Sequence, residues 1–318
     1  AEAGQEILRL GDEADFTFAS VDALGNVQVK EGFMEKHIQA ILQHPLVNKE
    51  IIKQRNFKIV VDAINSTGAV FVPYLLQQLG VVQYTIIHGE MHGKFEHNPE
   101  PLPENLQRIS AKVKEEKADL GIVVDPDVDR LCFVNEDGSL FGEEYSLVSI
   151  ADYMLSHQQG NTVSNLSSTR ALKDITLKHG GTYYASAVGE VNVVKKMKEV
   201  HAVIGGEGNG GIIVPELHYG RDALIGIALF LTHLAKKGIT MTALRHSYPN
   251  YFMSKNKISL SENFPIQKIF DALKEKYKQF PQHTEDGLKI EFEQEWVHLR
   301  TSNTEPIIRI YTESTSEE

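Results

Sequence analysis

The chain has 318 residues, with 32 Lys and Arg against 43 Asp and Glu and a formal net charge of −11. This length predicts two or three domains, because one domain usually holds ~100–200 residues. The acidic balance excludes a protein that binds nucleic acid or an anionic membrane surface through its overall charge. A phosphate ligand would therefore have to be held by a local cluster of cations.

The cysteine content and the apolar segments indicate a cytoplasmic protein. Cys132 is the single cysteine, so no internal disulfide can form, and it lies in an apolar run where a small buried side chain is expected. The longest apolar stretch, residues 223–235, is shorter than the ~20 residues of a membrane helix, and we predict a core helix there. The first residues have no signal-peptide pattern, and the start at Ala1 predicts that the chain begins inside a longer protein.

A first α/β pattern precedes residue 142. Apolar runs of strand length alternate with segments whose apolar residues recur at helical spacing, which indicates a mainly parallel sheet covered by helices. The expected elements are, in chain order, strand 57–62, helix 68–79, strand 84–88, helix 104–117, strand 120–124 and a hairpin of strands 131–135 and 139–141. Residues 1–35 fit no such pattern, and we interpret them as the remnant of a preceding domain and its linker.

The pattern then repeats once before it changes. The expected elements of the second round are strands 162–165, 182–185, 202–204 and 212–214 and helices 168–179, 190–200 and 221–237. Beyond about residue 250, helix 265–280 precedes strands 288–293, 296–300 and 307–312. The predicted fold class is therefore α/β, with two consecutive mixed or mainly parallel α/β domains, 36–142 and 143–252, followed by a small α+β C-terminal domain, 253–318.

The segment Asp125-Pro126-Asp127-Val128-Asp129-Arg130 carries the strongest chemical signal. It follows the predicted strand 120–124, and open α/β sheets bind their ligands at the carboxyl ends of their strands. Pro126 disfavours a helix before it, so the carboxylates can converge from a tight loop. Carboxylate oxygens are the ligands that Mg²⁺ selects, and an adjacent arginine can hold a phosphate. We predict that Asp125, Asp127 and Asp129 bind Mg²⁺ beside Arg130. The alternatives are an exposed acidic turn and a calcium loop, which would need glycine in place of the arginine.

A glycine-rich segment, residues 205–211, surrounds Glu207 and Asn209 with flexible backbone. A nucleotide-binding glycine loop would open a helix, whereas strand 212–214 is expected here. Carboxylate and amide groups form hydrogen bonds with sugar hydroxyls. We predict that Glu207 and Asn209 bind a sugar, and a simple turn is the alternative.

Residues 300–306 follow a predicted strand and precede a further arginine. Guanidinium groups, hydroxyls and loop N–H groups bind phosphate monoesters, whereas a polar turn would not explain the two flanking arginines. The predicted phosphate-binding residues are Arg300, Ser302, Asn303, Thr304 and Arg309.

Two other polar segments are interpreted as structural. Residues 165–170 end a strand and open a helix, which is typical of a capping sequence. His97 lies in the rigid segment 97–101 and has no neighbouring nucleophile to activate, so we predict no catalytic role for it.

Together and in this order, segments 125–130, 206–210 and 300–306 resemble the α-D-phosphohexomutase family over nearly the whole chain. The resemblance implies four domains around a cleft, of which this chain corresponds to the second, third and fourth. It also implies roles for the residues: Mg²⁺ binding by Asp125, Asp127 and Asp129, phosphate neutralisation in catalysis by Arg130, sugar binding by Glu207 and Asn209, and a grip on the non-reacting phosphate by Arg300, Ser302, Asn303, Thr304 and Arg309.

The family interconverts hexose 1-phosphates and 6-phosphates through a phosphoserine and a bisphosphorylated sugar. The resemblance thus implies a Mg²⁺-dependent mutase for a hexose or hexosamine phosphate: glucosamine, glucose or mannose. The family's phosphoserine motif is absent from this sequence, and Glu96 stands in the place of the serine before His97-Asn98-Pro99. Ala187 also replaces a lysine of many bacterial members. The chain by itself is therefore expected to be inactive.

Two alternatives from other classes remain. A non-catalytic sugar-phosphate-binding protein would keep the sugar and phosphate segments and need no metal. A metal-dependent phosphatase would use an Asp-x-Asp-x-Thr pattern, which neither Asp125 nor Asp127 begins. No nucleic-acid or membrane partner is predicted, and the sequence specifies no oligomeric state.

Overall fold

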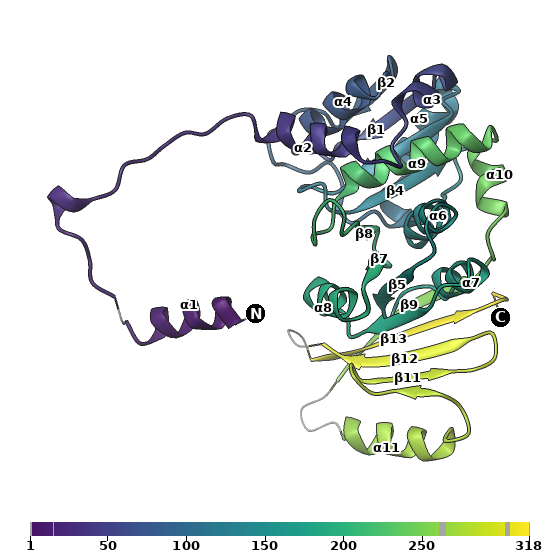
Figure 1. Ribbon diagram of the computed structural model, residues 1–318. Helices are drawn as coiled ribbons and strands as arrows, with labels where there is room; N and C mark the ends of the chain where they lie inside the picture. Colours follow the sequence, from purple (N-terminus) through teal and green to yellow (C-terminus); the bar gives the residue numbers. More distant parts are fainter. Residues whose placement is uncertain (1, 15, 261–264, 303–305, 318) are drawn as a thin grey trace. The chain divides into compact units, whose positions relative to one another are not determined.

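The computed structural model describes residues 2–14, 16–260, 265–302 and 306–317. The chain divides into two compact units, residues 1–36 and residues 37–318. The described part of the first unit contains helix α1 (Glu2–Asp12) and the short 3-10 helix η1 (Val21–Ala23), where the sequence predicts no regular element (Figure 1). None of the helices in the described ranges is long and apolar enough to cross a membrane.

The first α/β domain has a four-stranded sheet with the order β2-β1-β3-β4. Strand β1 is parallel to β2 and β3, whereas β4 is antiparallel to β3. Its elements are α2 (Phe33–Gln43), α3 (Lys49–Arg55), β1 (Lys58–Asp62), α4 (Gly68–Gln78), β2 (Gln83–Ile87), η2 (Pro103–Asn105), α5 (Gln107–Glu116), β3 (Leu120–Val124) and β4 (Leu131–Asn135).

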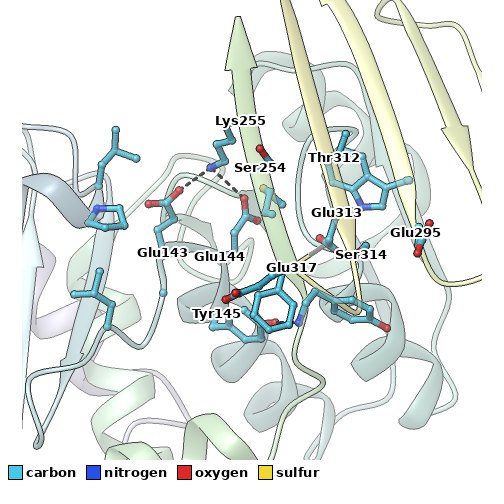
Figure 2. A pocket seen from close by; sticks show the side chains of 18 of the residues that line it. Glu143, Glu144, Tyr145, Ser254, Lys255, Glu295, Thr312, Glu313, Ser314 and Glu317 are labelled. Carbon is cyan, nitrogen blue, oxygen red and sulfur yellow. Dashed lines mark hydrogen bonds and ion pairs between the residues drawn. The ribbon is translucent and has the colours of Figure 1, made fainter.

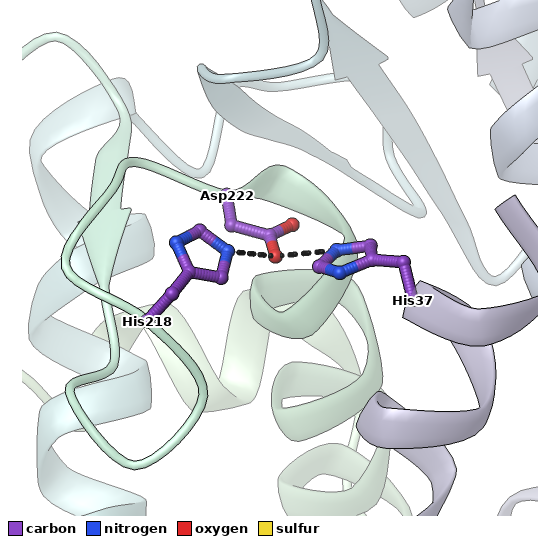
Figure 3. Close-up of side chains that lie close together, drawn as sticks. All are labelled: His37, His218 and Asp222. Carbon is purple, nitrogen blue, oxygen red and sulfur yellow. Dashed lines mark hydrogen bonds and ion pairs between the residues drawn. The ribbon is translucent and has the colours of Figure 1, made fainter. Parts of the chain in front are cut away.

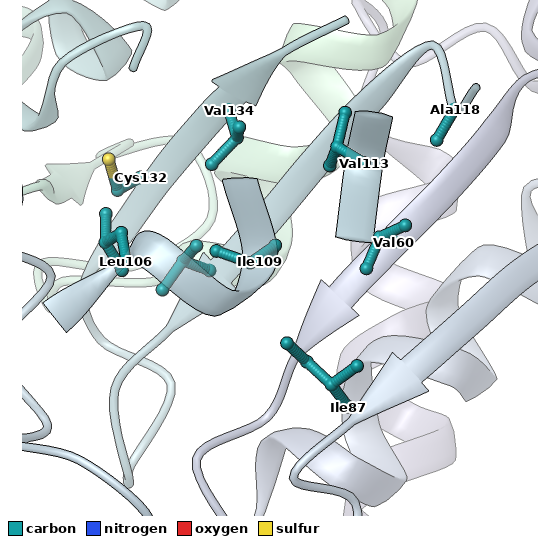
Figure 4. Close-up of a cluster of buried hydrophobic side chains, with 9 residues drawn as sticks. Val60, Ile87, Leu106, Ile109, Val113, Ala118, Cys132 and Val134 are labelled. Atoms are coloured by element: carbon teal, nitrogen blue, oxygen red, sulfur yellow. The ribbon is translucent and has the colours of Figure 1, made fainter. Parts of the chain in front are cut away.

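Helix α5 covers one face of this sheet. Its Ile109 and Val113 pack against Val60 and Val134 of the sheet (Figure 4). Cys132 belongs to the same core, as predicted, and burial raises the pKa of its thiol. Strand β3 is buried along its whole length, so its carboxyl end gives residues 125–130, which we call the acidic loop, a fixed starting point.

The second α/β domain has the strand order β6-β5-β7-β8. Strand β5 is parallel to β6 and β7, and β8 is antiparallel to β7. Helix α8 packs Val193 and Met197 against Val163 of the sheet. The elements are α6 (Glu143–Leu155), β5 (Asn161–Asn165), α7 (Ala171–Lys178), β6 (Tyr183–Ser186), α8 (Glu190–Val200), β7 (Ala202–Glu207), β8 (Gly211–Ile213), α9 (Ala223–Lys237) and α10 (Met241–His246).

Helix α9 connects the cores of the two α/β domains. The side chain of Asp222 accepts hydrogen bonds from two backbone N–H groups of the first turn, which caps the helix. Every residue from Ala223 to Ala235 is buried, which confirms the predicted core helix. Phe230 stacks on Phe133 of the first domain, with 3.8 Å between the ring centroids. The two domains therefore bury part of their apolar surface against each other.

The C-terminal domain has a five-stranded antiparallel sheet with the order β10-β11-β12-β13-β9. Its elements are β9 (Phe252–Ser259), α11 (Ile266–Lys276), β10 (Gln282–His283), β11 (Leu288–Glu291), β12 (Trp296–Thr301) and β13 (Ile307–Ser314). Successive side chains of a strand point to opposite faces. Helix α11 covers one face of this sheet (Figure 1). Leu299 and Ile310 pack with helix α11 on that face, so Arg300 and Arg309 lie on the other.

The structure confirms the predicted fold class of two mixed α/β sheets and a smaller C-terminal domain. Some predicted elements are wrong in detail. Residues 139–141 form an isolated bridge between Val134 and Leu140 and no strand, because the chain turns at Gly142 into the helix that begins at Glu143. Strand β7 continues to Glu207, since Gly205 and Gly206 pair with β8.

Strand β9 is absent from the prediction. Most of its residues are exposed and polar, so it has no apolar run that would indicate a strand. Its pairing with β13 fixes it as a strand, and this contact involves residues more than 40 positions away in the chain. The element matters because it carries Lys255 and Lys257 to the functional site.

Candidate active site

The acidic loop is shaped by its first aspartate. Oδ1 of Asp125 accepts hydrogen bonds from the backbone N–H groups of Asp129 and Arg130, both at 3.0 Å. Val128 has a φ of 61°, a left-handed conformation that β-branched residues rarely adopt. The turn places carboxylate oxygens of Asp125, Asp127 and Asp129 within 4.8 Å of one another. The carboxylates therefore converge as the sequence predicts.

The charges of this loop fit a cation. Burial and the neighbouring carboxylate of Asp125 raise the pKa of Asp129, although Arg221 opposes the rise. Among the described residues, Oδ1 of Asp129 is buried and has no hydrogen-bond partner. The Nε atom of Arg130 lies 3.5 Å from Oδ2 of Asp125 and 3.9 Å from Oδ1 of Asp129. A hard divalent cation would complete the contacts of Asp129 and offset the repulsion, so the donor set fits Mg²⁺.

Arg221 joins the acidic loop to the glycine-rich residues 205–211, which we call the sugar loop. Its guanidinium forms ion pairs with Asp129, with Glu207 at 3.1 Å and with Glu190 at 3.2 Å. The sequence does not point to Arg221, because its three partners belong to separate segments. A basic residue directly before Asp222, the N-cap of α9, is the local signal that could have drawn attention to it.

Backbone contacts bring the same two loops together. The N–H group of Leu131 donates to the carbonyl of Gly210 at 2.9 Å, and Arg130 forms a bridge with Gly211. Gly210 has a φ of 88°, and a Cβ atom there would lie 2.6 Å from the carbonyl oxygen of Leu131. Glycine is therefore required for the close approach of the acidic and sugar loops.

The two predicted sugar-binding residues differ in how tightly the protein holds them. Oε1 of Glu207 accepts hydrogen bonds from the side chain of Asn165 at 3.0 Å and from the backbone of Gly189 at 3.1 Å, and Oε2 pairs with Arg221. A carboxylate offers about four acceptor positions, so Glu207 can accept one more hydrogen bond. The side-chain oxygen of Asn209 accepts a hydrogen bond from the backbone N–H of Gly211 at 3.3 Å.

Three residues with cationic side chains lie side by side on the C-terminal sheet. Arg300 of β12 lies opposite Arg309 of β13, which lies opposite Lys257 of β9. We call these residues the cation row. Like charges directly opposite one another destabilise a sheet, and an anion bound between them would offset that cost. Asp286 lies 3.3 Å from Nε of Arg300.

Lys257 is the member of the cation row that is absent from the predicted site residues. The spacing of Lys255 and Lys257 is the signal that could have found it, because residues two apart share one face of a strand. Of the other predicted phosphate-binding residues, Ser302 donates its N–H to the carbonyl of Ile307 at 3.0 Å. Asn303 and Thr304 lie outside the described residues.

One cleft of about 440 Å³ is lined by residues of all three domains. This volume is within the range of small-molecule sites. The predicted residues along its walls are Arg130, Glu207, Asn209, Arg300 and Arg309. Lys255 and Lys257 also line it. The structure thus brings the three predicted motifs to one place, with the acidic loop next to Arg130.

A larger cavity, of about 900 Å³, shares Glu143, Glu144 and Lys255 with this cleft. Figure 2 shows Nζ of Lys255 between the two carboxylates, 2.6 Å from Glu143 and 3.6 Å from Glu144. Burial raises the pKa of Glu144 to about 8, and Lys255 opposes this rise. The remaining lining includes Tyr251 and Trp296 but neither the sugar loop nor the cation row. We therefore place a polar ligand in the smaller cleft.

Two successive α/β domains and a C-terminal sheet domain line one cleft, to which they contribute carboxylates and cations. This combination of fold and cleft defines the class of protein. Sequence models described as "Phosphoglucomutase/phosphomannomutase" match this chain: alpha/beta/alpha domain II over 35–138, alpha/beta/alpha domain III over 143–251 and the C-terminal domain over 258–318. The chain belongs to this family, the α-D-phosphohexomutases.

Individual relatives agree with this membership. A phosphoglucomutase/phosphomannomutase of Thermococcus kodakarensis is 34% identical over 308 residues, covering 96% of this chain and 66% of that protein. A probable phosphoglucosamine mutase of Pyrococcus abyssi is 31% identical over 321 residues, covering 100% of this chain and 69% of that protein. The crystal structure of a family protein from Burkholderia thailandensis has a TM-score of 0.84 at 27% identity, covering 100% of this chain and 67% of that one.

The chain thus spans about two thirds of the length of these relatives. The curated relatives are named as mutases, which are isomerases.

Proposed function

We propose that this chain supplies the metal, sugar and phosphate sites of a Mg²⁺-dependent phosphohexomutase, which interconverts a hexose or hexosamine 1-phosphate and 6-phosphate. The observation that carries the proposal is the single cleft that contains Arg130, the sugar-loop residues Glu207 and Asn209, and the cation row. A sugar phosphate carries hydroxyls and an anionic group, and these walls offer partners for both.

In this proposal Asp125, Asp127 and Asp129 hold Mg²⁺, which when bound neutralises charge on the phosphoryl group that is transferred. The guanidinium of Arg130 contacts the same phosphoryl group. Arg221 keeps Asp129 and Glu207 in fixed positions through its ion pairs. The acidic and sugar loops thereby act as one rigid support.

The opposite end of the substrate is held by the cation row, together with Ser302, Asn303 and Thr304. Arginines form bidentate contacts with phosphate oxygens, and a fixed remote phosphate orients the reacting end for transfer. The row lies on a paired sheet, which holds it more precisely than a free loop would.

The proposed cycle passes through a phosphoserine and a bisphosphorylated sugar. The family's phosphoserine motif does not occur among the 318 residues, so we expect this chain alone to bind substrate without turning it over. Our division into 36–142, 143–252 and 253–318 assigns one of the three sites to each domain. We favour the amino sugar, since Glu207-Gly208-Asn209 resembles the sugar loop of acetylglucosamine-phosphate mutases.

Calorimetric titration of the chain tests the binding part of this proposal. We expect Mg²⁺ to bind the wild-type chain and Asp127→Ala to remove that binding. Glucosamine 6-phosphate should bind in Mg²⁺ buffer, and Arg309→Ala should weaken it by about 10- to 100-fold, because a hydrogen bond to a charged group contributes about 1.5–3 kcal/mol. Lys268→Ala on the exposed side of α11 is the matched control and should change neither affinity.

Two outcomes would contradict the proposal. If Mg²⁺ does not bind and Asp127→Ala leaves the sugar-phosphate affinity unchanged, the chain is a non-catalytic sugar-phosphate-binding protein. If the chain alone converts glucose 1-phosphate above background, its expected inactivity is wrong. A substrate panel on the chain joined to a phosphoserine-bearing domain then selects among glucosamine, glucose and mannose phosphates.

A further inference from the structure

Two histidines and an aspartate meet where the first two strands of the first sheet end. Asp62 is the last residue of β1, His88 follows the last residue of β2, and His97 lies in the segment between β2 and α5. Their possible ligand atoms lie within 4.8 Å of one another. We call these residues the His–Asp cluster. It is separate from the acidic loop, which follows β3.

The cluster is shielded from solvent and closely packed. Nδ1 of His88 lies 2.8 Å from Oδ1 of Asp62, and Nε2 of His97 lies 3.1 Å from Oδ2. The side chains of Asp62, His88 and His97 are 1%, 4% and 16% exposed. Within the described ranges, Nε2 of His88 is buried and has no hydrogen-bond partner. Solvent therefore reaches the cluster mainly along His97.

The second nitrogen of His97 decides how the ring is protonated. Nδ1 of His97 lies 2.8 Å from the carbonyl oxygen of Asn98, and because a carbonyl only accepts, Nδ1 carries the hydrogen. In the neutral ring Nε2 then presents a lone pair to the carboxylate of Asp62. Two acceptors at this distance repel each other unless a proton or a metal ion lies between them. A histidine that donates its other N–H to a backbone carbonyl is the usual arrangement of a metal ligand.

A second group of the same composition has the opposite arrangement. Nε2 of His37 and Nε2 of His218 lie 2.8 Å and 3.0 Å from Oδ2 of Asp222 (Figure 3). The backbone N–H of Gly220 donates to Nδ1 of His218 at 3.0 Å, so Nε2 of His218 carries the hydrogen and donates to Asp222. This group is satisfied as a hydrogen-bonded brace and serves as an internal control.

We propose that the His–Asp cluster binds a first-row transition-metal ion of the Zn²⁺ type through Nδ1 of His88, Nε2 of His97 and the carboxylate of Asp62. Imidazole ligands suit such ions and not Mg²⁺. Three protein ligands with one position left for water are typical of an open zinc site. The proposal depends neither on the mutase function nor on Mg²⁺ binding by the acidic loop.

Metal binding at the cluster would fix one wall of the cleft. His97 lies three residues before Glu100, whose carboxylate is 3.5 Å from Nη1 of Arg130, and both Glu100 and Arg130 line the cleft. Four residues after Asp62, the hydroxyl of Ser66 donates to the carbonyl of Pro126 in the acidic loop at 2.8 Å. The ion would therefore connect the segment that carries Glu100 to the end of β1.

Calorimetric titration of the metal-free 318-residue chain with Zn²⁺, in excess Mg²⁺ to occupy the acidic loop, tests the proposal. We expect one Zn²⁺ per chain. His97→Gln replaces a partly exposed ligand with an amide of similar size and should weaken binding at least about tenfold. His37→Gln in the control group and Asp127→Ala in the acidic loop should leave the Zn²⁺ affinity unchanged. Co²⁺ bound to the wild type should give a visible absorption band that His97→Gln alters.

Three results would overturn the proposal. No saturable Zn²⁺ binding, or equal binding by His97→Gln, would show that a protonated His97 paired with Asp62 accounts for the contact. Loss of binding in His37→Gln would place the ion at the control group. Loss in Asp127→Ala would place it in the acidic loop. Circular dichroism of each variant verifies that the fold is kept, and Asp62→Asn provides a second ligand change if His97→Gln does not fold.

Discussion

The cleft has an acidic wall and a basic wall, and the two are built in different ways. On the acidic wall, Glu207 lines the cleft and shares Arg221 with Asp129 and Glu190, which lie outside the lining, so part of the negative charge is neutralised within the protein. On the basic wall, strand pairing places the cation row in register. The acidic wall is therefore preorganised by its own ion pairs, whereas the basic wall keeps like charges adjacent, with Asp286 paired to Arg300, and gains most when an anion binds.

Removal of Arg221 should have the largest effect on this arrangement. Arg221→Ala leaves three carboxylates without their shared partner. Because these ion pairs are only partly buried, we expect a loss of about 3 kcal/mol in the free energy of unfolding, at the lower end of the range for fully buried pairs. Urea denaturation measures this loss. Mg²⁺ should restore more stability to Arg221→Ala than it adds to the wild type, because the acidic loop has lost a competing cation.

Arg221→Lys is the matched control for charge. It keeps the positive charge but cannot form the three-way contacts of a guanidinium, so its loss should be intermediate. A loss below about 1 kcal/mol for Arg221→Ala would mean that the contacts behave like surface ion pairs and that the acidic wall is not preorganised by them.

Asp222→Asn tests the brace beside Arg221. Burial would raise the pKa of Asp222, but hydrogen bonds from His218 and His37 outweigh it and hold the pKa at about 2, below the ordinary value of 3.8. A lowered pKa stabilises the fold above the unfolded value and loses that contribution as the pH falls toward the folded value. We expect Asp222→Asn to cost about 2 kcal/mol at neutral pH.

The pH dependence of this loss of unfolding free energy shows whether the loss comes from the charge of Asp222 or from the shape of its side chain. The difference in unfolding free energy between Asp222→Asn and the wild type should narrow as the pH falls from about 4 toward 2. Urea denaturation at a series of pH values measures it. A difference that stays constant over this range would attribute the effect to helix capping alone.

Lys257→Ala should have the smallest effect of the set. Lys257 lies on β9, at the edge of the sheet, and we expect a loss of about tenfold in glucosamine 6-phosphate affinity, or about 1.4 kcal/mol, with no change in Mg²⁺ affinity. Calorimetric titration measures both constants. An unchanged sugar-phosphate affinity would restrict the basic wall to the two arginines.

The acidic loop was readable from the sequence because its determinants are local. The apolar run 120–124 predicts a strand that the structure confirms as β3, and Pro126 and the spacing of the aspartates lie within the next few residues. The core helix α9 was readable for the same reason, since its burial follows from a continuous apolar stretch. Local patterns of this kind specify where an element lies and which groups it carries.

The tertiary structure alone decided which distant groups meet. Arg221 gained its partners from three segments, and Lys257 joined the arginines only through the pairing of β9 with β13. His88 meets Asp62 because two parallel strands end side by side, and the segment after β2 brings His97, to which the sequence assigns no role, to the same carboxylate. Sequence by itself determined the family's motifs and the fold class. The contacts that combine these motifs depend on strand register and domain packing, whose energies are shared among residues far apart in the chain.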